Sequence, residues 1–233
     1  FETDEVISTS KMFQGCEELK VINIDSNKFS TKKNTDMSFM FQDCQNLEEL
    51  DVSNFDTSNV KDMSYMFQNC ELLKVIDVSN FDTSQVTNMA GLFSYCKSVG
   101  SLNLQKFDTK NVVDMSSLFQ YCSDLKSLDL TKFNTEKVVD MSSMFQYCIS
   151  INNLDLSSFK TSLVRDMSLM FDSCLSISSL KLSNFDTSSV TNMWRMISYC
   201  TSLTSLDVSS FDTSKVTDMS EMFKYTSSVT YLD

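Results

Sequence analysis

The chain has 233 residues, a formal net charge of −12, no histidine and no proline. Because phosphate neutralisation needs clustered Lys and Arg, so acidic a chain is expected neither to bind nucleic acid nor to attach to anionic lipid. Nucleophilic catalysis by a Ser–His or Cys–His pair is excluded because the base is missing. No apolar run approaches the roughly 20 residues of a membrane-spanning helix, so membrane insertion is not expected either.

A fixed repeat runs through the chain. Its eight cysteines are separated first by 28 residues and then always by 26, at positions 16, 44, 70, 96, 122, 148, 174 and 200. A period of about 20–29 residues is typical of leucine-rich-repeat solenoids, whose coils bury their apolar sides against one another. We therefore predict an α/β solenoid, a right-handed superhelix of about nine coils that forms one domain over residues 1–233.

The first part of each unit predicts a short strand. In the unit at 47–70, Leu50 and Val52 alternate with Asp51 and Ser53. A period of two places the leucine and valine in the core and the aspartate in solvent. We expect each such strand to pair in parallel with the same segment of the next coil.

The last part of each unit predicts a short helix. Met63, Met66, Phe67 and Cys70 follow the i, i+3, i+4, i+7 spacing of one helical face. The preceding residue, Asp62 in this unit, is Asp or Asn in nearly every unit, and both are good N-caps. Because two helical turns are marginal alone, the helix should depend on packing against the strand layer.

Phenylalanine and threonine columns connect the two parts and are interpreted as structural. An unbroken phenylalanine column would fill the core, and the threonine column would bury its methyl groups while its hydroxyls bind backbone groups of the turn. These positions include Phe55, Thr57, Phe81, Thr83, Phe107, Thr109, Phe133 and Thr135.

The cysteines are also interpreted as structural, with Cys70, Cys96, Cys122 and Cys148 in the middle of the column. Without histidine or a C-x-x-C pair they do not form a zinc site, and we expect no metal centre and no cofactor. Disulfides between coils are an alternative in an extracellular setting. We favour buried free thiols, because side chains that all point inward in parallel do not converge as a disulfide requires.

The motif MFxxCxxLxxLDLSxFDTSxVxDMSxMF resembles the BspA-like leucine-rich repeats of bacterial and protist surface proteins, over almost the whole chain. The resemblance implies an extracellular or cell-surface location and a binding or adhesive role, and it supplies no catalytic residues. Because the chain begins and ends within a repeat, we expect it to be part of a longer array.

Two columns are candidate binding surfaces. An outward aspartate column would attract a basic partner or hold divalent cations weakly, or would simply be solvated strand ends: Asp51, Asp77, Asp129, Asp155 and Asp207. A tyrosine column would provide rigid contact area, or would merely cover a corner of the coil: Tyr95, Tyr121, Tyr147, Tyr199 and Tyr225. Trp194 stands where most units have serine and is predicted to point outward.

The positions that flank the aspartates vary from coil to coil and would encode specificity, among them Glu48, Glu49, Lys74, Lys126, Asn152, Asn153, Ser178, Ser179, Thr204 and Ser205. We therefore predict a non-catalytic surface module for protein recognition or adhesion. The alternative is a structural unit that self-associates into an extracellular fibre or coat.

Overall fold

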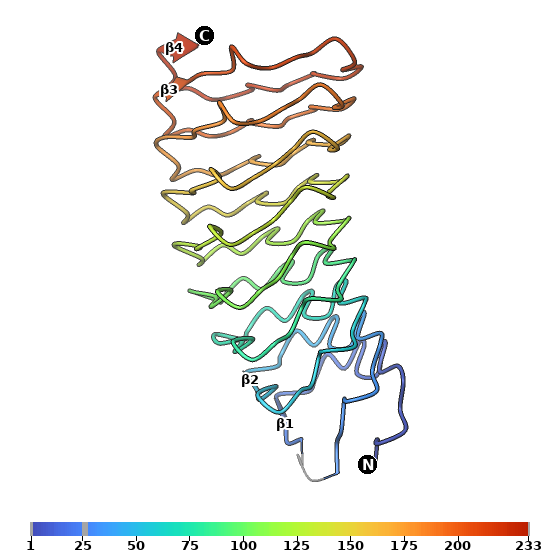
Figure 1. Ribbon diagram of the computed structural model, residues 1–233. Coiled ribbons are helices and arrows are strands. Elements are labelled where there is room, and N and C mark those ends of the chain that lie inside the picture. Colours follow the sequence, from blue (N-terminus) through green and yellow to red (C-terminus); the bar gives the residue numbers. More distant parts are fainter. Residues whose placement is uncertain (1, 25–27, 233) are drawn as a thin grey trace.

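The computed structural model describes residues 2–24 and 28–232, and it stacks successive coils so that the two termini lie at opposite ends (Figure 1). The strongest regularity is at the Asp or Asn position before each leading Met. Parallel bridges join Ser8 to Asp36, Asp36 to Asp62, and so on to Asp218, in steps of 26 residues after the first. Because each bridge joins equivalent positions of neighbouring coils, the chain is a repeat solenoid.

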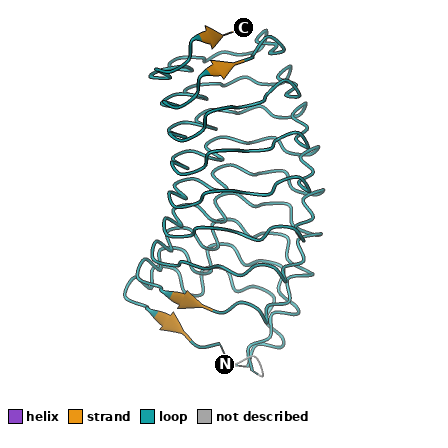
Figure 2. Ribbon diagram, turned by 90° about the vertical axis from the view of Figure 1, so that its left-hand side faces the viewer, coloured by secondary structure: helices purple, strands orange, loops and turns teal. Residues whose placement is uncertain are grey.

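Within the described residues, the predicted strands form only near the ends of the stack (Figure 2). Strand β1 (Val21–Ile22) pairs in parallel with β2 (Glu49–Leu50), and β3 (Ser205–Leu206) pairs in parallel with β4 (Tyr231–Leu232). The prediction of one strand in every coil is therefore wrong for the middle coils. There the regular cross-coil pairing lies at the Asp/Asn bridges and the turns that follow them.

The predicted helices are also wrong, because residues 2–24 and 28–232 contain none. In the unit at 63–70, alternate N–H groups bond to the next coil: Met63, Tyr65 and Phe67 donate to the carbonyls of residues 88, 90 and 92. Intervening N–H groups close four-residue β-turns, as when Met66 donates to Met63 and Cys70 donates to Phe67. A donor used between coils cannot serve an α-helix, which needs every N–H four residues back.

Two columns of left-handed residues make these turns possible. The φ angle is 56° at Tyr65 and 63° at Asn69, and the equivalent residues of other coils share this conformation. Such a φ fits the third position of a type II turn, which favours Gly or Asn. Gly91 meets that preference, and it also leaves room for a ring, since a Cβ there would lie 2.3 Å from the Tyr65 side chain.

The core is a set of columns that pass from coil to coil. Phe41, Phe67, Phe93 and Phe119 are fully buried and stack with ring centroids 5.9–6.0 Å apart. The FDT phenylalanines form a second buried column, in which Phe55 is 5% and Phe133 is 2% exposed. The buried remainder of the unit at 60–78 is Val60, Met63, Met66, Cys70, Leu73, Ile76 and Val78.

The threonine column joins coils rather than closing a local turn, which corrects the expected partner. The Thr57 hydroxyl donates to the Asp82 carbonyl (2.9 Å) and accepts the Asp82 N–H (2.8 Å). The hydroxyls of Thr83, Thr109 and Thr135 make the same pair of bonds to residues 108, 134 and 160. Each of these four threonines therefore satisfies both backbone groups of one residue in the next coil.

Candidate functional site

The aspartate column lies exposed on the side of the coil that carries the predicted strands. Asp51 Oδ1 accepts the Ser53 N–H at 2.9 Å, and the same turn recurs at Asp77, Asp155 and Asp207. Hydrogen bonds from the side chain and then the N–H of Ser53 lower the pKa of Asp51. At Asp129, Thr131 has the same effect. The repeated carboxylate thus has a structural reason, because it closes a turn.

Departures from this column are informative. Asn103 keeps the turn, since its Oδ1 accepts the Gln105 N–H at 3.3 Å. Lys181 has no acceptor to offer and places one positive charge between Asp155 and Asp207. Grooves of about 470 Å³ and 350 Å³ lie on its two sides and share Ser179 and Ser183.

The backbone beneath these grooves is open. No backbone hydrogen bond joins residues 152–156 to residues 178–182, both of which lie wholly within the described part of the chain. Side-chain bonds join the two coils at either end of this gap: Ser176 Oγ donates to the Ile149 carbonyl at 2.7 Å, and Asn184 Nδ2 donates to the Leu156 carbonyl at 3.0 Å. We call this surface, residues 46–53 and the equivalent segments up to 202–209, the strand face.

The expected cation site has no geometric support. Among the described residues, no three Cys, Asp or Glu side chains converge so as to hold a metal ion. The strand face has at most one aspartate of this column in each coil, and each aspartate already uses one oxygen in its turn.

The tyrosine column occupies one of the left-handed columns. Tyr95, Tyr121 and Tyr147 stack with centroids 4.2 Å and 4.3 Å apart, and Tyr199 and Tyr225 form a second, tilted pair at 4.9 Å. The buried Ser173 separates the groups. Tyr147 is 36% and Tyr225 is 61% exposed, so the column is an accessible aromatic ridge only in part.

Trp194 is less prominent than predicted. Its side chain is half-buried, and the Arg195 guanidinium lies 5.2 Å from the ring centroid. Arg195 Nε is held in turn by Glu221 Oε2 at 2.5 Å. A tryptophan covered by an ion-paired arginine is a poor candidate for first contact with a partner.

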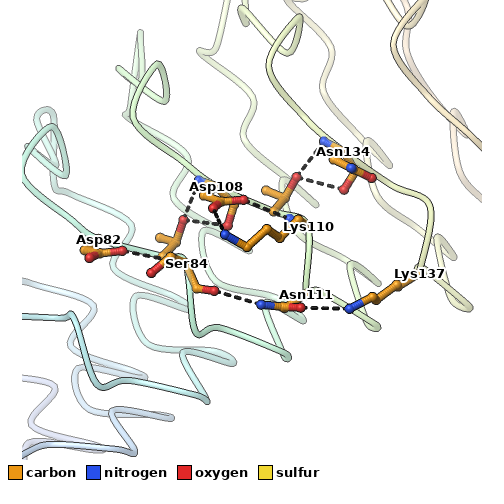
Figure 3. Close-up of polar contacts among 9 residues, drawn as sticks. Asp82, Ser84, Asp108, Lys110, Asn111, Asn134 and Lys137 are labelled. Carbon is orange, nitrogen blue, oxygen red and sulfur yellow. Dashed lines mark hydrogen bonds and ion pairs between the residues drawn. The ribbon is translucent and has the colours of Figure 1, made fainter.

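A second aspartate column closes the turn that precedes the bridge residues. The Ser84 N–H donates to Asp82 Oδ1 at 2.9 Å, and Asn111 Nδ2 donates to the Ser84 carbonyl at 2.9 Å (Figure 3). Lys137 Nζ then donates to Asn111 Oδ1 at 2.8 Å. Aspartates of this column therefore resemble those of the strand face in geometry but lie at a separate position of the coil.

The cysteines are free thiols in the structure. Cys16 is exposed and the other seven are buried. Each buried thiol donates to a carbonyl of the preceding coil, as Cys70 Sγ does to Phe41 at 3.2 Å. Burial raises the pKa of Cys44 to about 11 and of Cys122 and Cys200 to about 12, so these thiols are poor nucleophiles.

Sequence reasoning missed an apolar patch at the start of the strand face. Leu72 is 43% and Val75 is 70% exposed, and Leu72 lines a groove of about 380 Å³ with Glu48 and Lys74. The available signal was an apolar residue at positions that most coils fill with Ser, Asn or Asp.

Together these features define a repeat protein whose surface columns present the same position of successive coils side by side. The family described as "Mycoplasma protein of unknown function, DUF285" matches residues 1–101, 71–180 and 150–231. The chain therefore belongs to this family. No curated protein matches the chain. Across the described residues, no helix is long and apolar enough to cross a membrane.

Solved structures with weak similarity include a leucine-rich repeat protein from Bacteroides ovatus ATCC 8483, at 18% identity and a TM-score of 0.43, covering 97% of this chain and 66% of that one. A leucine-rich cell-surface protein from Faecalibacterium prausnitzii A2-165 has 16% identity and a TM-score of 0.34, covering 87% and 77%. TLR13, solved in complex with ssRNA13, has 17% identity and a TM-score of 0.40, covering 81% and 32%. The expectation that this chain does not bind nucleic acid gains no support from them.

Proposed function

We propose that this chain is a non-catalytic recognition module of the cell surface or extracellular space, which binds a basic protein partner through its strand face. The observation that carries the proposal is the exposed aspartate column, flanked by side chains that change from coil to coil. A repeated acidic frame attracts a basic partner, and variable flanks discriminate between partners. The resemblance of the repeats to BspA-like surface proteins supports the location.

The chemistry of the column supports binding rather than catalysis. General acid–base catalysis needs two groups whose environments push their pKa values apart. In the strand-face aspartates the pKa is lowered throughout, by the same hydrogen bonds from the residue two positions on. All five therefore stay ionised at neutral pH and act together as one negative stripe.

We predict that replacing Asp129 and Asp155 by Asn weakens binding of a short oligolysine peptide about 3- to 10-fold and flattens its salt dependence. Asparagine keeps the turn, as Asn103 does, so only charge is removed. The affinity is measured by calorimetry at low and at moderate ionic strength.

The matched control replaces Asp186 and Asp212 by Asn. These exposed residues cap turns in the same way, but they belong to the second aspartate column. Their replacement removes two negative charges, as the replacement of Asp129 and Asp155 does. The proposal expects little change for this control. Equal loss in both variants would mean that net charge alone attracts the peptide, and the strand face would not be the site.

A further inference from the structure

Among the described positions of the bridge ladder, Asp140 is the one aspartate that has an aspartate in both neighbouring coils. Asp114, Asp140 and Asp166 follow one another, with Asn88 before them and Asn192 after them. All three side chains are half-buried, and neighbours in such a ladder lie about 4.8 Å apart. Like charges directly opposite each other destabilise a sheet, so this stretch carries a cost that the asparagine positions avoid.

The two asparagines show how a neutral side chain fits the ladder. Asn88 Nδ2 donates to Asp62 Oδ2 at 3.3 Å, and Asn192 Nδ2 donates to Asp166 Oδ2 at 3.0 Å. The Oδ1 of each asparagine still caps its own turn by accepting the N–H two residues on. The side-chain amide of each asparagine therefore donates a hydrogen bond to the second carboxylate oxygen of the aspartate in the preceding coil.

The bridge partner of Asp114 in the next coil is Asp140. An ionised Asp140 has no proton to donate to Asp114. Asp140 Oδ1 accepts the Ser142 N–H at 2.8 Å. The charged or titratable groups that act on the pair are Asp166 and the phenol of Tyr65, whose pKa is raised by burial and by both carboxylates. Within residues 2–24 and 28–232, no lysine or arginine forms an ion pair with the three aspartates.

We propose that these three carboxylates form a proton-binding site, in which Asp140 takes a proton from solvent on acidification and donates Oδ2–H to Asp114 Oδ2. The proton then completes the ladder as the amide does at Asn88 and Asn192. The second oxygen of Asp166 already accepts the Asn192 amide. Proton binding tightens the middle of the solenoid, whatever partner the strand face binds.

This proton should make the folded chain more stable as the pH falls. Burial, with Asp114 and Asp166 adding to it, raises the pKa of Asp140 in the folded chain. The folded state therefore binds this proton more readily than the unfolded state does. The resulting stabilisation is complete below the unfolded pKa of about 3.9 and is lost as the pH rises through the folded pKa.

The test compares Asp140→Asn with the wild-type chain by urea unfolding from neutral pH down to about pH 4. We expect Asp140→Asn to lower the unfolding equilibrium constant about 2- to 30-fold at neutral pH, because two like-charge contacts disappear. The stability advantage of Asp140→Asn over the wild-type chain should shrink as the pH falls. Asp218→Asn is the control: Asp218 caps Ser220 in the same way, but its ladder neighbour is Asn192 and its pKa is lowered by Ser220.

The control variant should show no gain at neutral pH. Independently of any variant, carboxyl carbon NMR on the wild-type chain should show Asp140 titrating above Asp218. A pKa of Asp140 at or below about 3.9 would overturn the proposal. So would an advantage of Asp140→Asn that is the same at all pH values.

Discussion

Replacing Phe133 by Ala is expected to lower the free energy of unfolding by about 3–5 kcal/mol. Phe133 is only 2% exposed and lies in the middle of its column, with coils on both sides that hold the surrounding side chains in place. The loss combines the transfer free energy of the ring with the cavity that remains, and a solenoid core cannot collapse into that cavity without disturbing both neighbouring coils.

Urea unfolding followed by circular dichroism measures this loss. Leu163→Ala is the control, because Leu163 is 51% exposed and its replacement should change stability by less than about 0.5 kcal/mol. A loss below about 1 kcal/mol for Phe133→Ala would show that the FDT phenylalanines do not carry the core.

Thr135→Val should be costly although it hardly changes the shape of the side chain. The Thr135 hydroxyl donates to the Lys160 carbonyl at 2.8 Å and accepts the Lys160 N–H at 2.7 Å, and the residue is fully buried. Valine leaves both backbone groups without a partner, at about 1–3 kcal/mol each. We expect a total loss of about 2–5 kcal/mol in the free energy of unfolding.

Thr135→Ser separates the hydroxyl from the methyl group. Serine keeps both hydrogen bonds and should lose only about 1 kcal/mol for the buried methyl. If the valine variant proved as stable as the serine variant, the threonine column would be a packing feature and would not hold neighbouring coils together.

The sequence predicted the solenoid well because its period is constant after the first unit. A 26-residue spacing of Cys, Phe and Thr restricts each position to contacts with its counterparts, and the bridges from Asp36 to Asp218 follow that spacing. The capping role of Asp62 was also predictable, since its Oδ1 accepts the Ser64 N–H at 2.8 Å. What it caps, however, is a turn and not a helix.

The helix prediction failed because a spacing of i, i+3, i+4, i+7 reports only which residues face inward. Successive turns also place Met63, Met66, Phe67 and Cys70 in the core. The N–H groups of Met63 and Phe67 bond to the next coil, while those of Met66 and Cys70 close turns within their own coil. The distinguishing signal was weak: Gly15 and Gly91 occupy the two left-handed columns, which other coils fill with residues such as Tyr65. A helix interior disfavours glycine.

The candidate site was predictable in position but not in cause. The exposure of Asp51 and its equivalents follows from strand alternation, whereas their turn-closing bonds depend on a backbone path that periodicity does not reveal. The half-burial of Trp194 could not be foreseen either, because it depends on Arg195, which Glu221 of the next coil holds in place.

Amide hydrogen exchange tests most directly whether the coils are joined by their turns while the strand face stays open. The N–H groups of Ser143, Phe145 and Tyr147 bond to the next coil at 2.8–2.9 Å, and residues 152–156 make no backbone bond to residues 178–182. We predict strong protection at 143, 145 and 147 and fast exchange throughout 152–156. Equal or stronger protection at 152–156 would mean that a continuous parallel sheet closes the strand face, and would contradict this account.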